Sequence, residues 1–254
     1  MGSIPELESG GYDAVEEVTV LVTGFGPFLQ NKENASWSIA STLPPFLEPN
    51  AAHPSRIRLV VHPSPMKVAY NPVLEQDPQI IAQVNPDVIL HIGLAAGRSY
   101  FTLERGAHRD GYDQIADVEG HKFSAERSKK VFGDCPAVLQ PTFRVEDVWR
   151  RWRSELADQG IDVRPSEDAG NFLCGFIYYT SLAYFYKKDG RERPVMFLHV
   201  PVLPKEEDVA KGRKVAEALI RALVDSRRQR GVEDLIAAAD MTPTSTAPTD
   251  VNFR

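Results

Sequence analysis

The sequence predicts an α/β fold in which an open, mostly parallel, twisted sheet carries helices on both faces, as a three-layer α/β/α sandwich. Near-continuous apolar runs such as VTVLVTGF (18–25) are typical of strands that are buried on both faces. Such runs alternate along the chain with amphipathic stretches of helical length. Strands joined in this order through helices form parallel sheets. The length of 254 residues, with 43% hydrophobic residues, allows one large core.

Each element follows from its own pattern. The predicted strands are 18–25, IRLVVHP (57–63), DVILHIG (87–93) and the start of VMFLHVPVLP (195–204), which leads into a loop, with strand-like pieces such as SYFTLERGA inside the polar stretch 95–131. The predicted helices are 36–43, DPQIIAQVN, 145–156, about 169–186 and the long amphipathic stretch 206–230. In DPQIIAQVN we expect Asp77 to be the N-cap and Pro78 the first helical residue.

Composition sets the domain limits and the setting. We expect a flexible leader over 1–16, a single α/β domain over 17–232, and a disordered tail over 233–254, which is rich in Thr, Pro and Ala near its end. The net charge of −6 argues against a nucleic-acid or anionic-membrane partner. The acidic first residues lack the apolar core of a signal peptide, so we expect none here, and the sequence has no apolar run of membrane-spanning length. Two cysteines make neither a disulfide framework nor a four-ligand zinc site, so we expect a cytoplasmic protein without a metal.

The loop after the first strand reads TGFGPF and allows two interpretations. Gly24 and Gly26 could begin a phosphate-binding loop, but the third glycine of that motif is missing and Pro27 lacks an amide donor. The other interpretation uses Phe25 and Phe28. On a stiff loop at the carboxyl end of a strand, their rings could form the walls of a pocket for a small, flat, uncharged ligand.

Two carboxylates and one histidine are candidates for chemistry. Glu104 lies in an alternating stretch that could face it inward, and Asp117 is a second inward candidate. His199 lies near the end of a buried strand, where parallel sheets place their sites. His91 lies in the middle of a strand and is expected to be an ordinary core histidine.

Cys174 can be a core residue or a nucleophile. Buried cysteines are common and usually inert, and by local chemistry alone this interpretation is favoured. However, Cys174 falls in the early turns of a predicted helix, where the helix dipole favours a thiolate and free amides could stabilise an oxyanion. His199 could then act as its base, with Glu104 or Asp117 orienting the imidazole. Cys135, in a loop before a proline, is expected to be a bystander.

Around these residues, the chain resembles the pyroglutamyl peptidase I (pyrrolidone-carboxylate peptidase) family of cysteine peptidases. Four segments carry the resemblance in the order of the family and cover most of the chain: VLVTGFGPF with NASW, GLAAGRSYFTLERGA, SEDAGNFLCGFIYY and FLHVPVLP. One segment alone would be weak, but four in order around the suspected residues are fairly specific.

The resemblance implies an exopeptidase that removes N-terminal pyroglutamate (5-oxoproline) from small peptides, without metal or cofactor. It implies that Cys174 is the nucleophile, His199 the general base and Glu104 its orienting residue. Phe25 and Phe28 would flank the lactam ring, whose flat and uncharged shape suits aromatic walls. The resemblance leaves the oligomeric state open.

The chain departs from the family pattern near these motifs. Gly175 replaces the usual asparagine after the cysteine, Arg109 ends a changed glutamate motif, and Gln114 and Val118 stand in a segment that usually reads RIPDN. These departures motivate an alternative, namely a weak or inactive homologue that binds a small cyclic or peptide ligand. A third hypothesis, a phosphate- or nucleoside-handling enzyme, is disfavoured by the defective glycine motif.

Overall fold

The computed structural model describes residues 17–28 and 32–240 and confirms the predicted fold class. Its main sheet has seven strands in the order β2-β3-β1-β4-β9-β5-β8. Their bounds are β1 Glu17–Gly24, β2 Phe46–Leu47, β3 Arg56–Val61, β4 Val88–Leu94, β5 Phe101–Glu104, β8 Val163–Ser166 and β9 Val195–Val200. The central strands β3, β1, β4 and β9 are parallel, whereas β2 and β5 run antiparallel to their neighbours β3 and β9. A separate two-stranded ribbon pairs β6 Ala107–His108 with β7 Val138–Leu139.

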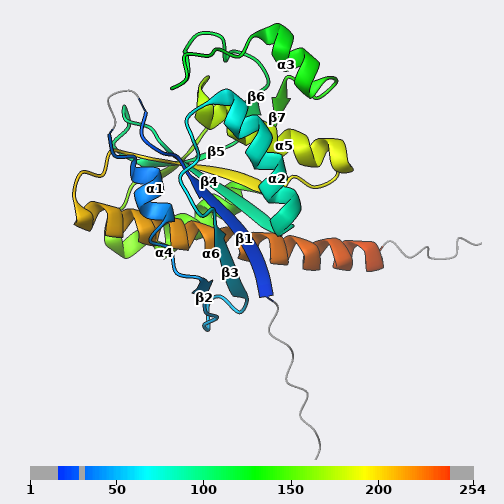
Figure 1. Ribbon diagram of the computed structural model, residues 1–254. Coiled ribbons are helices and arrows are strands. Elements are labelled where there is room, and N and C mark those ends of the chain that lie inside the picture. Colours follow the sequence, from blue (N-terminus) through cyan, green and yellow to red (C-terminus); the bar gives the residue numbers. More distant parts are fainter. Residues whose placement is uncertain (1–16, 29–31, 241–254) are drawn as a thin grey trace, which may run out of the picture.

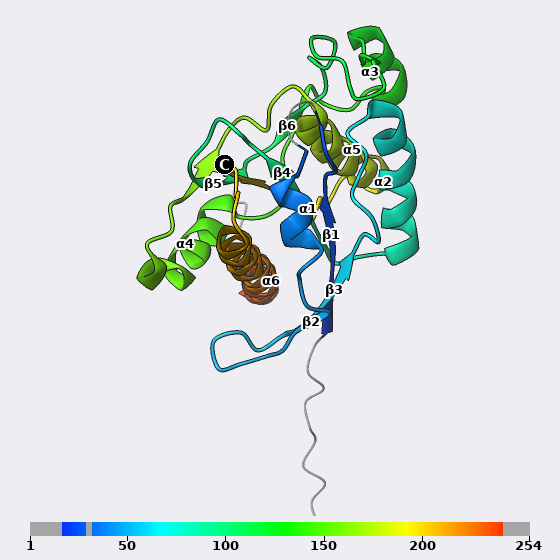
Figure 2. The ribbon, with the colours of Figure 1, turned by 60° about the vertical axis from the view of Figure 1, so that its left-hand side comes forward.

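Helices cover both faces of the main sheet (Figures 1 and 2). One face carries α1 Ala35–Ala40, α4 Val145–Glu155 and α6 Glu206–Asp240, and the other carries α2 Tyr70–Val84 and α5 Leu173–Lys188. A short helix α3 Ala125–Phe132 packs beyond α5, and a 3₁₀ turn, Ala157–Gln159, follows α4. Within the described part of the chain, none of the helices combines the length and apolar character that crossing a bilayer requires.

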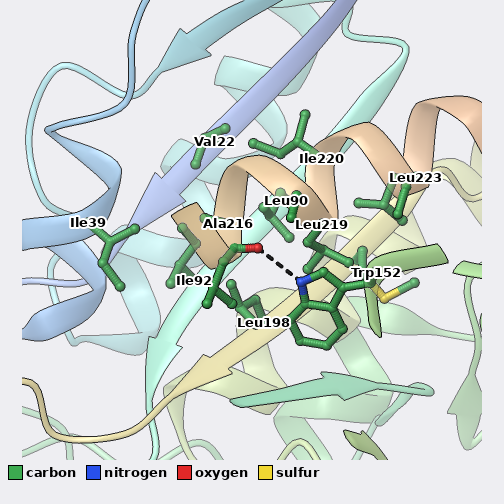
Figure 3. Packing of buried hydrophobic residues seen from close by; sticks show 14 of the residues in the cluster. Val22, Ile39, Leu90, Ile92, Trp152, Leu198, Ala216, Leu219, Ile220 and Leu223 are labelled. Carbon is green, nitrogen blue, oxygen red and sulfur yellow. Dashed lines mark hydrogen bonds between the residues drawn. The ribbon is translucent and has the colours of Figure 1, made fainter. Parts of the chain in front are cut away.

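The two faces have separate apolar cores. The core under α4 and α6 is built around Trp152, which is fully buried among strand residues such as Leu90 and Leu198 (Figure 3). The indole nitrogen of Trp152 donates a hydrogen bond to the backbone carbonyl of Val215 in α6, at 3.0 Å. A buried indole therefore leaves no donor unsatisfied, which keeps the burial of this large ring favourable.

The start of α2 corrects one sequence prediction. Asp77 is not an N-cap, because the helix begins at Tyr70 and runs through Pro78. The cap comes from a distant residue: the carboxylate of Asp117 accepts a hydrogen bond from the amide of Tyr70, at 2.9 Å. A carboxylate at a helix start satisfies an orphan amide and complements the helix dipole. Asp77 instead lies inside the helix, fully buried.

The other differences lie at element ends and in short elements. The sequence did not predict β2, β6, β7, β8 or α3, all of which have eight residues or fewer. The strand predicted at the start of 195–204 ends at Val200 and leads into a loop, as expected. Helix α6 continues to Asp240, past the predicted end of the domain at residue 232. The predicted leader 1–16 and the end of the predicted tail, 241–254, lie outside the described residues.

Candidate functional site

Three sequence-predicted residues meet where β4 and β9 end. His199 is the next-to-last residue of β9, and its register partner on β4 is Gly93. Cys174 is the second residue of α5, the helix that covers this face of the sheet. A methyl group placed on Gly93 would lie 2.8 Å from Cys174 Sγ, so the thiol rests directly on the backbone of β4. The Cys174 thiol therefore lies over Gly93 of β4, and His199 occupies the paired position on the adjacent strand β9.

Glu104 reaches His199 from the neighbouring strand β5. The strand runs antiparallel to β9, with Thr102 opposite His199 in the register. The alternation expected from the sequence holds: Leu103 enters the core under α4 and α6, and Thr102 and Glu104 face α5. Glu104 Oε1 lies 2.8 Å from His199 Nδ1, with the carboxylate fully buried and the imidazole nearly so. Since Nδ1 is engaged by the carboxylate, Nε2 is the ring nitrogen left for the thiol or a substrate.

The carboxylate of Glu104 has further partners that stabilise its charge. Arg98 Nη1 donates to Oε1 at 2.6 Å, and the hydroxyl of Thr102 donates to the same oxygen at 2.9 Å. Burial alone would raise the pKa of Glu104, but its interactions with His199, together with those with Ser166 and Arg98, outweigh burial and hold the pKa below its usual value. Glu104 is therefore an anion at neutral pH. Its second oxygen, Oε2, is buried without a hydrogen-bond partner.

Arg98 is the residue that sequence reasoning undervalued. It was one charge among many in a polar stretch, and most such charges are solvated. In the structure its side chain also donates to the backbone carbonyl of Asp168, at 3.1 Å. Arg98 thus links the Glu104 carboxylate to the segment that leads into α5 and Cys174. Its spacing to Glu104 in GRSYFTLE offered only a faint signal, because the contact depends on a turn between the two residues.

Cys174 does not have the thiolate character that its helix position suggested. Burial raises the pKa of its thiol to about 12, the nearby Glu104 charge adds to this, and Arg98 opposes it. A backbone hydrogen bond at the start of α5 also favours the thiolate, but burial outweighs it. The helix start acts in the expected direction but does not decide the outcome: at neutral pH the thiol carries its proton, and a base must remove it.

The glycine-containing loop is held by α1. A methyl group on Gly24 would lie 2.6 Å from the backbone oxygen of Ser36, so only glycine allows this approach. The amide of Phe25 donates to Ser36 Oγ, and the Asn34 side chain caps α1 while donating to the carbonyl of Gly26. The Phe25 amide and the Gly26 carbonyl therefore bind side chains at the start of α1 and fix the shape of the loop.

The two aromatic residues of this loop have different surroundings. Phe25 is only 2% exposed and belongs to the core under α5. Phe28 is partly buried, and its ring centroid lies 6.3 Å from that of Phe172, the N-cap residue of α5. Phe28 is therefore the partly buried ring of the pair, and it lies near Phe172, which precedes Cys174 by two residues in the sequence.

The remaining candidates have structural contacts. Asp117 accepts hydrogen bonds from the backbone amides of Tyr70, Glu119 and His121, and among the described carboxylates it is Glu104 that contacts His199. His91 is a fully buried core histidine, as expected. Cys135 is buried, and burial raises the pKa of its thiol.

The departures from the family pattern have visible contacts. A methyl group on Gly175 would lie 2.0 Å from the carbonyl oxygen of Gly170, so a residue with a side chain would displace the loop before α5. The guanidinium of Arg109 contacts Asp110 and the carbonyl of Cys135. The side chain of Gln114 contacts its neighbour Asp113, and Val118 is exposed. The presence of glycine at position 175, where the family usually has asparagine, therefore allows the loop that carries Asp168 and Gly170 to pass close to α5.

Comparison with known proteins supports the family expected from the sequence. The family model described as pyroglutamyl peptidase matches residues 18–227. Human pyroglutamyl-peptidase 1 is 29% identical over 213 residues, covering 83% of this chain and 91% of the human protein. The pyrrolidone-carboxylate peptidase of Pyrococcus furiosus is 29% identical over 196 residues, covering 76% and 86%. The structure of the pyrrolidone carboxyl peptidase from Thermococcus litoralis has the same fold, with a TM-score of 0.68, 23% identity and coverage of 84% and 96%.

The raised pKa of Cys174 predicts how its alkylation depends on pH. With a pKa of about 12, the thiolate fraction grows about tenfold for each pH unit, so the rate of carboxamidomethylation by iodoacetamide should rise without a plateau from pH 7 to pH 10. The rate is followed by mass spectrometry of the peptide that contains Cys174, with the buried Cys135 as an internal reference. A plateau that begins below pH 7 would show instead a preformed thiolate.

Replacing Gly93 by alanine should disturb the contact between β4 and α5. The added methyl would lie 2.6 Å from Phe197 Cζ and 2.8 Å from Cys174 Sγ, which is overpacking in a closed core. We expect Gly93→Ala to lower the free energy of unfolding by roughly 1–3 kcal/mol in urea titrations. Gly97→Ala is the matched control, because a methyl there meets nothing within 4 Å. Equal stabilities for the two variants would contradict the tight approach.

Proposed function

The chain belongs to the pyroglutamyl peptidase family, and from this premise we propose that it is a cysteine exopeptidase that hydrolyses the N-terminal pyroglutamyl residue from peptides. In this proposal Cys174 is the nucleophile, His199 the general acid and base, and Glu104 the residue that orients the imidazole. One observation carries the assignment: the buried contact of 2.8 Å between Glu104 Oε1 and His199 Nδ1, next to the strand position on which the Cys174 thiol rests.

The first half of the reaction forms an acyl-enzyme. His199 Nε2 takes the proton from Cys174 Sγ as the sulfur attacks the carbonyl carbon that joins pyroglutamate to the next residue. Because the resting thiol is protonated, proton removal and attack are coupled. When the tetrahedral intermediate collapses, the C–N bond breaks and His199 Nε2–H protonates the leaving amine. Amides in the first turn of α5 have no acceptor within the helix and could stabilise the oxyanion.

The second half releases the product. A water molecule gives a proton to His199 Nε2 and attacks the thioester carbon, and the C–S bond then breaks. The proton returns to Cys174 Sγ, and free pyroglutamate leaves. Throughout, the anionic Glu104 holds Nδ1–H and stabilises the imidazolium that forms twice in each cycle. Arg98 acts through Glu104 as a positioning residue, since it contacts the carboxylate and not the imidazole.

An aromatic ring near Cys174 supports the proposed substrate class. A lactam has a flat ring without charge, which suits the apolar face of Phe28, the partly buried ring of the pair, whereas Phe25 is enclosed in the core and cannot flank a ligand unless it moves. Substrates would be small peptides with a blocked N-terminus, which carry no ammonium group for a carboxylate to bind. Both cysteines are free, and a catalytic thiol must stay reduced, which supports a cytoplasmic location as part of this proposal.

Release of a fluorescent amine from a pyroglutamyl amide tests the proposal directly. The unmodified protein should turn the substrate over, Cys174→Ser should lose about 10³-fold or more in kcat, and Cys135→Ser should keep its activity, because its thiol takes no part. A prolyl amide, which lacks the lactam carbonyl, should not be cleaved. No turnover by folded, reduced protein would instead favour a homologue that binds a small cyclic or peptide ligand.

Glu104→Gln should separate the orienting carboxylate from the rest of the site. The amide has the same shape but no charge to stabilise the imidazolium, and its NH₂ group can face Nδ1 and favour the wrong tautomer. We expect kcat for the pyroglutamyl amide to fall by about 10²–10⁴-fold, with KM within about threefold. The control is Glu146→Gln, an exposed carboxylate that pairs with Arg105 and should leave both constants unchanged. Unchanged kcat in Glu104→Gln would contradict the assigned role.

A further inference from the structure

A line of four buried polar side chains lies behind the candidate site. The hydroxyl of Thr23 on β1 lies 2.8 Å from His91 Nδ1 on β4, and His91 Nε2 lies 2.8 Å from the hydroxyl of Ser181 on α5. Ser181 Oγ in turn donates to Asp77 Oδ2 on α2, at 2.7 Å. All four side chains are fully buried. This buried polar network therefore ties two strands and two helices together.

The directions of these hydrogen bonds are linked. Ser181 has one proton, so while it donates to Asp77 its oxygen accepts from His91 Nε2–H. His91 Nδ1 is then an acceptor for the hydroxyl of Thr23. Burial lowers the pKa of His91 to about 3, so the imidazole is neutral and this tautomer is available. Each member thus depends on the next for its orientation.

The buried polar network contributes little to the stability of the fold. Burial raises the pKa of Asp77 to about 7, with only the Ser181 hydrogen bond opposing it, and Asp77 Oδ1 has no hydrogen-bond partner. Polar groups in an apolar contact cost free energy unless they are fully paired. The proposed chemistry uses none of the four. We therefore consider which parts of the structure these four residues position.

Two of these residues hold the helix that carries the nucleophile. Ser181 follows Cys174 by seven residues, which is about two turns, so the two side chains share one face of α5. On β4, His91 and Gly93 are two residues apart and share one face of the strand. The helix thus meets the strand at two points, with Ser181 on His91 and the thiol of Cys174 on Gly93.

A second contact path leads from His91 to the general base. The ring centroid of Phe197 lies 6.3 Å from that of His91 and 4.7 Å from that of His199. The same phenylalanine limits the space over Gly93. A change in the orientation of His91 would therefore shift the Cys174 thiol through α5. It would also shift the His199 ring through Phe197.

Apolar packing alone leaves the register of α5 weakly defined, because hydrophobic contacts have no direction. Ten of the sixteen residues of α5 are buried, most of them apolar. A hydrogen bond, by contrast, weakens steeply as its angle and length change. We propose, resting on the function proposed above, that Ser181 and His91, supported by Thr23 and Asp77, are positioning residues that fix the rotation and register of α5 on β4 and so place the Cys174 thiol beside His199.

The test compares two hydroxyls on the same helix. Ser181→Ala removes the network hydroxyl, and Thr180→Val removes the neighbouring buried hydroxyl, which binds only the carbonyl of Phe176 within α5. We expect Ser181→Ala to lower kcat for the pyroglutamyl amide by about ten- to hundredfold, with KM within about twofold, since small displacements of reacting groups have such effects. Thr180→Val should keep both constants within about twofold, and Ser181→Thr, which retains a hydroxyl, should recover kcat.

Two further measurements keep the outcome clear. Thr23→Val keeps the shape of a β-branched strand residue and removes the partner of His91 Nδ1, so it should fold and still lower kcat without changing KM. Urea midpoints for every variant correct each rate for the folded fraction. The proposal is overturned if Ser181→Ala or Thr23→Val retains full kcat, or if Thr180→Val loses as much as Ser181→Ala.

Alkylation of Cys174 separates this proposal from the function on which it rests. The rate of reaction with iodoacetamide reports how the thiol is placed beside its base, and it needs no substrate. We expect a slower rate in Ser181→Ala and an unchanged rate in Thr180→Val. If the unmodified protein cleaves no pyroglutamyl amide, the proposed function fails, while the alkylation rates still decide the role of Ser181. Equal rates in both variants would overturn the positioning role.

Discussion

Helix α5 lies so close to strand β4 that a methyl group on Gly93 would be 2.8 Å from Cys174 Sγ, and the candidate site depends on this approach. The thiol of Cys174 occupies the space that a side chain on Gly93 would take, and the strand partner of Gly93 is His199. Backbone hydrogen bonds fix the distance between β4 and β9, so the only adjustable distance is that between the helix and the sheet. The packing of α5 therefore decides whether sulfur and imidazole can act together.

The charges of the site are arranged to suit a buried location. One carboxylate, Glu104, keeps its charge because Arg98, Thr102 and His199 all contact the same oxygen. The thiol keeps its proton because burial and the Glu104 charge both oppose a thiolate. A protonated thiol avoids the cost of burying a thiolate–imidazolium pair in the resting protein. In the proposed mechanism, the proton moves from the thiol to the imidazole only when a substrate is bound.

A different carboxylate, Asp77, shows how context changes the role of a residue. In the sequence it reads as the cap of a short helix, followed by a proline in the expected place. In the structure the cap of that helix comes from Asp117, which is 47 residues away from Tyr70 in the sequence. The Asp77-Pro78 pair matches the usual start of a helix, but the hydrogen bond from Tyr70 to Asp117 allows α2 to begin seven residues before Asp77. Asp77 is therefore buried inside the helix. Local propensity is a weak prior that packing can override.

The sequence by itself determined the fold class, the main strands, and the segments that hold Cys174, His199 and Glu104, because apolar periodicity and motif order are written in the chain. Only the tertiary structure decided which carboxylate meets the imidazole, that Arg98 supports it, that the thiol is protonated, and that a buried polar network joins α5 to β4. Each of these depends on distances between residues far apart in sequence and on burial, and neither quantity can be read from the order of residues alone.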